Sequence, residues 1–78
     1  MNNWKNVDNK LVRDFEFKDF GEAIDFINKV ANIANKQNHH PEIINNYNKV
    51  TLKLSTHDAG DMVTEKDEDL AREIEKLT

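Results

Sequence analysis

A long uninterrupted helical segment limits what this 78-residue chain can fold into. Neither glycine nor proline occurs between Glu22 and Asn38, and apolar residues recur there at the spacing of one helix face. Asp19 precedes the segment as a cap, with Glu22 in the capping-box position, and Pro41 prevents the helix from continuing. The apolar face of this helix must be covered by another layer, which the rest of the chain has to supply.

Alternating apolar and polar residues predict two hairpins, one on each side of this helix. The expected strands are residues 4–7, 10–17, 42–46 and 49–56, with turns at Asp8-Asn9 and Tyr47-Asn48. A final helix follows Thr64 and Asp67, which form a second cap, and its apolar stripe includes Leu70 and Ile74. We predict a single α+β domain over residues 1–78. In it, a four-stranded antiparallel sheet of two hairpins packs both helices on one face.

Size and charge narrow the class of protein. A chain this short buries only about 60–65% of its unfolded surface, and it has no cysteine to form disulfides. We therefore expect a homo-oligomer. The net charge of −4, with most acidic residues near the C-terminus, argues against a nucleic-acid-binding surface. No apolar run approaches the roughly 18 residues of a membrane span, and no signal peptide is evident, so we expect a cytoplasmic protein.

All three histidines occur in two short segments at the edges of predicted elements. His39 and His40 follow the long helix, and His57 follows the last strand. An imidazole has an unperturbed pKa of about 6.5, so it can take or give a proton near neutrality. Three interpretations are open: proton transfer within one cleft, a three-histidine metal site, or histidines that are merely on the surface.

The surrounding residues resemble a known family. They are His39-His40-Pro41-Glu42, Tyr47-Asn48-Lys49-Val50, Leu54-Ser55-Thr56-His57-Asp58-Ala59-Gly60 and Thr64-Glu65-Lys66-Asp67. Together with Trp4, residues 15–20 and the helix before the His-His-Pro motif, this pattern is similar to that of the pterin-4a-carbinolamine dehydratases. The resemblance covers nearly the whole chain, and its motifs are specific.

This resemblance implies a hydro-lyase that dehydrates 4a-hydroxytetrahydropterin to quinonoid dihydropterin, with no metal or other cofactor. The implied context is tetrahydrobiopterin recycling for aromatic amino-acid hydroxylases, by a homodimer or homotetramer. His39, His40 and His57 would be the catalytic residues. We expect His39 and His57 to be the proton donor and acceptor, in an order left open, and His40 to orient the substrate.

The resemblance also places acidic residues at the substrate. Asp67 would polarise a histidine or hold the pterin, although a helix cap explains it equally well. Glu42 and Asp58 flank the expected site, and the alternative is that they are solvated loop acids. Trp4 is expected in the core or at a subunit contact, and Tyr47 as a packing or turn residue.

Two positions depart from the family pattern. Asn35 stands where an ionisable residue is usual; its amide can orient an imidazole but cannot stabilise an imidazolium as a carboxylate does. Asp61 stands where a glycine is usual. Two further functions are weighed. One is a non-catalytic dimerization module, because vertebrate members of the family also serve a homeodomain transcription factor. The other is a metal-dependent hydrolase that uses the three histidines.

Overall fold

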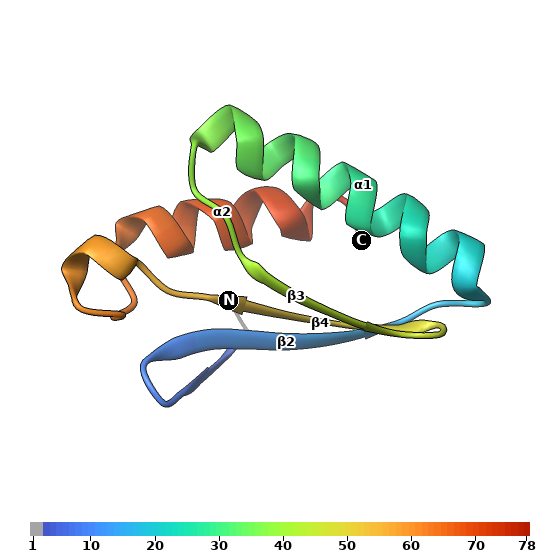
Figure 1. The fold of residues 1–78 in the computed structure, drawn as a ribbon, viewed down its shortest axis with the longest axis horizontal. Helices are drawn as coiled ribbons and strands as arrows, with labels where there is room; N and C mark the ends of the chain where they lie inside the picture. The colour runs from blue at the N-terminus through green and yellow to red at the C-terminus, as the bar shows by residue number, and fades with distance from the viewer. Residues whose placement is uncertain (1–2) are drawn as a thin grey trace.

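The computed structural model describes residues 3–78. Its elements are β1 (Lys5–Val7), β2 (Lys10–Glu16), α1 (Phe20–Gln37), β3 (Glu42–Asn46), β4 (Lys49–Leu54), the short 3₁₀ turn η1 (His57–Ala59) and α2 (Glu65–Glu75). The strands form one antiparallel sheet in the order β1-β2-β4-β3. Both helices cover the same face of this sheet, which confirms the predicted α+β fold (Figure 1). Neither helix is long and apolar enough to cross a membrane, among the residues described.

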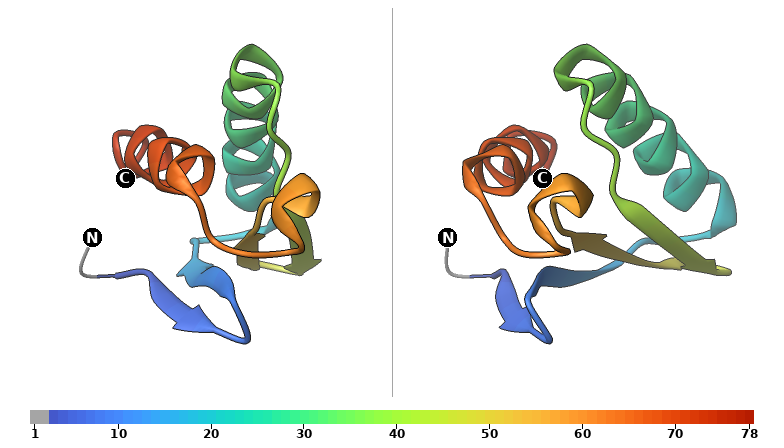
Figure 2. Two further views of the ribbon diagram at one scale, coloured as in Figure 1. Left: turned by 90° about the vertical axis from the view of Figure 1, so that its left-hand side faces the viewer. Right: turned by 60° about the vertical axis from the view of Figure 1, so that its left-hand side comes forward.

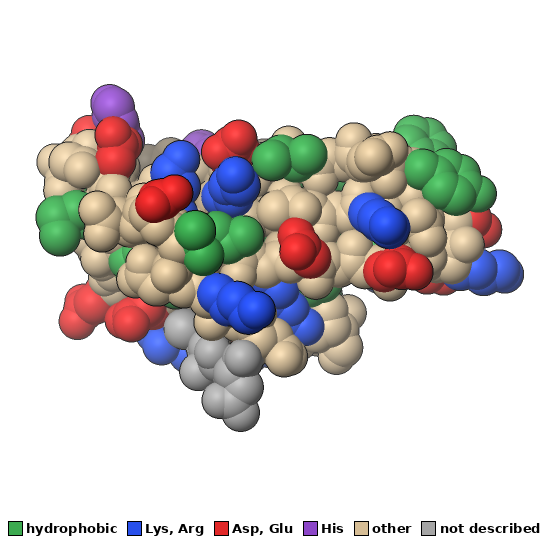
Figure 3. Space-filling view, turned by 90° about the horizontal axis from the view of Figure 1, so that it is seen from below, with side chains coloured by type: hydrophobic (Ala, Val, Ile, Leu, Met, Phe, Trp, Pro, Cys, Tyr) green, Lys and Arg blue, Asp and Glu red, His purple; other side chains and the backbone are tan. Residues whose placement is uncertain are grey.

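The register of the two central strands separates an apolar face from a polar one. Phe15 pairs with Val50, and Leu11 pairs with Leu54, so these side chains lie on the face beneath the helices. The neighbouring pair, Val12 with Lys53, points to the opposite face. Figure 3 shows this outer face, where charged side chains are interspersed and hydrophobic ones form separate patches. The alternation seen in the sequence therefore reflects one covered and one uncovered face.

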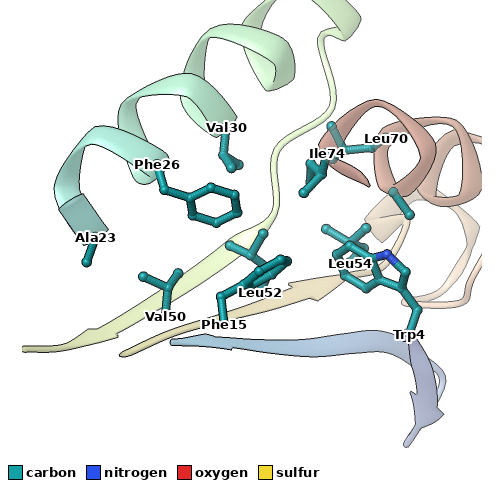
Figure 4. Packing of buried hydrophobic residues seen from close by; sticks show 11 residues of the cluster. Trp4, Phe15, Ala23, Phe26, Val30, Val50, Leu52, Leu54, Leu70 and Ile74 are labelled. Atoms are coloured by element: carbon teal, nitrogen blue, oxygen red, sulfur yellow. The ribbon is translucent and has the colours of Figure 1, made fainter. Parts of the chain in front are cut away.

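The core lies between the sheet and the two helices (Figure 4). Its buried members are Trp4, Phe15, Ala23, Phe26, Val30, Val50, Leu52, Leu54, Leu70, Ala71 and Ile74. Phe15 of β2 and Phe26 of α1 join sheet to helix, with ring centroids 4.6 Å apart. Trp4 packs edge-on against Phe15 at 6.3 Å and so belongs to the core, one of the two places expected for it.

Caps define both ends of α1. The Asp19 side chain accepts a hydrogen bond from the Glu22 N–H (2.9 Å), as the capping pattern predicted. The Glu22 carboxylate does not reach back to Asp19 itself but accepts from the Lys18 N–H (3.0 Å). At the other end Asn38 adopts a left-handed conformation with φ of 52°, which turns the chain sharply out of the helix.

Replacing Asn38 with alanine is expected to lower the free energy of unfolding by about 1 kcal/mol, because a Cβ-bearing residue other than asparagine or aspartate is disfavoured in the left-handed region. Glycine at the same position should be neutral or stabilising. Urea denaturation of both variants measures this. Asn28→Ala, at an exposed position within α1, is the control and should not be destabilised. An Asn38→Ala protein as stable as the wild type would contradict the prediction.

The last strand ends earlier than the sequence predicted. β4 stops at Leu54, and Thr56 forms only an isolated bridge with Met62. The Thr56 carbonyl accepts from both the Ala59 N–H (3.2 Å) and the Asp61 N–H (3.1 Å), so the chain curls into η1 instead of extending. His57 consequently begins a turn and does not end a strand.

Candidate active site

The α1–β3 connection, η1 and the start of α2 come together at one end of the molecule (Figure 2). A cleft there is lined by all three histidines. The cavity measures about 250 Å³. It is lined by Asn38, His39, His40, Ser55, Thr56, His57, Asp58 and Lys66, and we call it the histidine cleft. Every lining residue is polar, and titratable groups come from all three segments.

His39 is fixed by the end of α1 and by a carboxylate of α2. Its backbone N–H donates to the Ala34 carbonyl (3.1 Å), directly after the left-handed turn at Asn38. Its Nε2 lies 2.5 Å from Oδ1 of Asp67, and its side chain is 13% exposed. Because a carboxylate can only accept, Nε2 carries the proton. The neutral imidazole then has its lone pair on Nδ1, so this geometry makes His39 able to accept a proton.

Asp67 is fully buried, and its second oxygen completes a hydrogen-bonded chain. Oδ2 accepts from the Thr56 hydroxyl (2.8 Å) and from the Thr64 N–H (2.9 Å). Since Thr56 gives its only hydroxyl proton to Asp67, the 2.6 Å contact between the two threonine hydroxyls must use a proton from Thr64. Thr64 in turn accepts from the Lys66 N–H (3.3 Å). Both carboxylate oxygens of Asp67 and both threonine hydroxyls therefore have hydrogen-bond partners.

Within residues 3–78, Asp67 forms an ion-pair contact with His39 and with no lysine or arginine, and its position helps to account for its burial. It lies in the first turn of α2, where the unpaired N–H groups and the helix dipole stabilise negative charge. The sequence left open whether Asp67 caps the helix or polarises a histidine. In the structure one oxygen contacts the cap at Thr64 and the other contacts His39, so one side chain makes both contacts.

His40 is held by Asn35, one of the two positions that depart from the family pattern. The amide Oδ1 of Asn35 lies 3.1 Å from Nε2 of His40 and accepts its proton. Both side chains are on the outside of the protein. The Asn35 amide therefore orients an imidazole, and this imidazole belongs to His40, the second histidine of the His39-His40 pair.

The side chain of His57 is 91% exposed. Its Nδ1 lies 3.1 Å from Oδ1 of Asp61. The hydrogen bond and charge of Asp61, with a smaller effect of the charge of Asp58, raise the pKa of His57 above its ordinary value of 6.5. Because the folded state holds this proton more tightly, the interaction stabilises the fold below about pH 6.5. That contribution is lost as the pH rises through the folded pKa.

Of the other residues predicted for the site, one lines the histidine cleft and one does not. Asp58 lines the histidine cleft, whereas Glu42 does not. The carboxylate of Glu42 lies 3.8 Å from the Lys10 ammonium. Sequence reasoning missed Thr56 and Lys66 as site residues. Both lie inside the quoted motifs, next to His57 and Asp67, so adjacency to those residues was the available signal. Tyr47 is an exposed turn residue with φ of 56°.

A larger hollow adjoins the histidine cleft. It measures about 510 Å³, runs along α2 beside the end of α1, and shares His39 and Lys66 with the cleft. Within residues 3–78, no three histidine, aspartate or glutamate side chains gather closely enough to hold a metal ion. The geometry therefore offers three separately supported imidazoles and one ammonium around a space of small-molecule size.

The histidine cleft thus contains an imidazole in contact with a buried carboxylate and a second, exposed imidazole, which are groups able to exchange protons with a small molecule. Comparison with known proteins specifies the class further. The chain belongs to the pterin 4 alpha carbinolamine dehydratase family, whose family model matches residues 1–77.

Relatives support this membership. The chain is 54% identical to a Picosynechococcus protein named "Putative pterin-4-alpha-carbinolamine dehydratase", over 95% of this chain and 79% of that protein. A protein of the same name from Sulfolobus acidocaldarius is 46% identical over 95% of this chain and 80% of its own length. The family resemblance stated from the motifs is thereby confirmed.

Solved structures agree with the fold. A crystal structure of a transcriptional coactivator/pterin dehydratase from Brucella melitensis matches with a TM-score of 0.91 and 39% identity, over 99% of this chain and 83% of that one. A pterin dehydratase-like protein, described as a RuBisCO assembly factor in the alpha-carboxysome, matches with a TM-score of 0.75 and 17% identity, over 95% of this chain and 84% of that one. The second likeness concerns the fold alone.

Proposed function

We propose that the histidine cleft dehydrates 4a-hydroxytetrahydropterin to quinonoid dihydropterin by acid–base catalysis. The observation that carries this proposal is the hydrogen bond from His39 to the buried Asp67, which leaves a basic nitrogen at a cleft shared with two further histidines. Membership of the dehydratase family supports the choice of a pterin substrate.

The reaction requires two proton movements. A base removes the proton on N5, the electron pair of N5 forms the double bond to C4a, and the C4a–O bond breaks. The departing hydroxyl takes a proton from an acid and leaves as water. Neither movement needs a metal or an organic cofactor, and positioned acid–base groups typically contribute about 10²–10⁴-fold.

We assign the base to His39 and the acid to His57. The Nδ1 lone pair of His39 is available because Nε2 is bound to Asp67. His57 favours its protonated form because the carboxylates of Asp61 and Asp58 raise its pKa. His40, held by Asn35, orients the substrate in this proposal, and Asp67 acts through His39, since it is fully buried.

The remaining expectations belong to the same proposal. They are one domain over residues 1–78, a homodimer or homotetramer, a cytoplasmic location and a link to an aromatic amino-acid hydroxylase.

The test follows 4a-hydroxytetrahydropterin dehydration by ultraviolet absorbance, with the wild type, without protein, and with a metal chelator. We expect acceleration over the spontaneous rate that is insensitive to the chelator. His39→Gln should reduce the catalysed rate about 10²-fold, because the amide cannot accept the N5 proton. Asn28→Gln, exposed on α1, is the control and should retain full activity. Absence of acceleration by the wild type would overturn the proposal.

A further inference from the structure

The loop after β4 places a carboxylate against His57. Main-chain hydrogen bonds close this loop, from the Thr56 N–H to the Met62 carbonyl (2.8 Å) and from the Asp61 N–H to the Thr56 carbonyl (3.1 Å). The Gly60 N–H also donates to the His57 carbonyl (3.0 Å). Main-chain hydrogen bonds therefore fix the position of residue 61 from which its side chain extends.

Asp61 occupies a backbone conformation that glycine would adopt more easily. Its φ is +59°, directly after Gly60 at +78°, and only glycine, asparagine and aspartate enter this region readily. The turn therefore accommodates aspartate but does not require its carboxylate. The carboxylate does make the 3.1 Å contact between its Oδ1 and Nδ1 of His57. Because the turn does not require the Asp61 carboxylate, the contact of this carboxylate with His57 points to a role at the site.

This contact determines which nitrogen of His57 can deliver a proton. The Nδ1–H donates to Asp61 in both protonation states, so the proton that can leave is the one on Nε2. The carboxylates of Asp61 and Asp58 favour the imidazolium form of His57, and the Lys66 ammonium lines the same cleft. His39 and His40 also line the cleft.

We propose that Asp61 is a positioning residue that keeps His57 oriented and protonated as the proton donor of the dehydration. This inference rests on the proposed function. In the step concerned, the Nε2 proton of His57 passes to the hydroxyl on C4a as the C–O bond breaks and water leaves. His57 is then neutral, with its Nδ1–H still bound to Asp61, and it regains a proton from solvent because it is exposed.

The test compares Asp61→Asn and Asp61→Gly with the wild type. Nuclear magnetic resonance of the His57 ring reports its titration midpoint without any need for activity. We expect the midpoint to fall in both variants, because each removes the carboxylate charge. In the wild type it should also fall at 1 M salt, where the Debye length shrinks to about 3 Å. Asp69→Asn, an exposed carboxylate on α2 beside Arg72, is the control and should leave the midpoint unchanged.

Activity separates positioning from loop structure. The alkaline limb of the kcat–pH profile should move to lower pH in both variants, in step with the titration midpoint. Asp61→Gly should be as stable as the wild type or more stable, because glycine relieves the left-handed conformation. If Asp61 served only the turn, glycine would preserve the pH profile.

Two results would overturn the inference. One is an unchanged His57 midpoint in the Asp61 variants, and the other is a lowered midpoint with an unmoved kcat–pH limb. A wild type that does not accelerate the dehydration would instead overturn the proposed function and the donor role with it. The titration would still report whether Asp61 and His57 interact, so the two failures can be told apart.

Discussion

Asp67→Ala is expected to lower the free energy of unfolding by about 3 kcal/mol and the catalysed dehydration rate about 10²-fold. The carboxylate is fully buried and accepts hydrogen bonds from His39, Thr56 and the Thr64 N–H. Alanine leaves these donors without an acceptor, removes the bond that Asp67 contributes to the capping box of α2, and opens a void. The same change frees the His39 ring, so its basic nitrogen is no longer held in place.

Asp67→Asn distinguishes charge from volume. Asparagine fills the same space, but one end of its side chain is a donor and must face either His39 or the two donors at Oδ2. We expect a protein more stable than Asp67→Ala that still has reduced activity. Asp69→Asn, exposed two residues further along α2, should change stability by no more than about 0.5 kcal/mol. Urea denaturation and the absorbance assay measure both quantities, and an Asp67→Ala protein of wild-type stability would contradict the network described.

Ile74→Ala is expected to destabilise the protein by about 3 kcal/mol, since it removes a fully buried side chain from the layer between α2 and the sheet. At about 0.05–0.15 kcal/mol per residue, a chain of this length has a total stability of about 4–12 kcal/mol. The substitution therefore removes a large share of it. A strong decrease in the thermal midpoint should be seen by circular dichroism.

Ile44→Ala provides the matched control. Ile44 is also an isoleucine, but it lies on β3 and is 43% exposed, so its truncation removes little buried area and leaves no cavity. We expect a change of no more than about 1 kcal/mol. Equal destabilisation by the two substitutions would show that the core beneath α2 is not packed as described.

Elements with a clear period could be predicted from the sequence. Residues 22–38 show helical spacing and residues 10–17 show period two, and both assignments are confirmed because one face of each element is buried. The turn at η1 could not be predicted. It depends on hydrogen bonds to the Thr56 carbonyl from residues further along the chain, which leave no periodic pattern.

The candidate site, too, could be predicted from the sequence only in part. The histidines could be selected because they are three, clustered and chemically distinctive, and the cap formed by Thr64 and Asp67 is a local pattern. The contact between Asp67 and His39 joins residues 28 apart, so it depends on how α2 packs against α1. No spacing rule could indicate that one carboxylate oxygen would reach the cap and the other the imidazole.

The His39–Asp67 hydrogen bond joins the end of α1 to the first turn of α2. The orientation of the His39 ring and the docking of the two helices are consequently thermodynamically linked, because both depend on this contact. A ligand that immobilises His39 should therefore also stabilise the junction of the two helices. In a chain of 78 residues, the contacts that hold the candidate site in place are also contacts that hold the fold together.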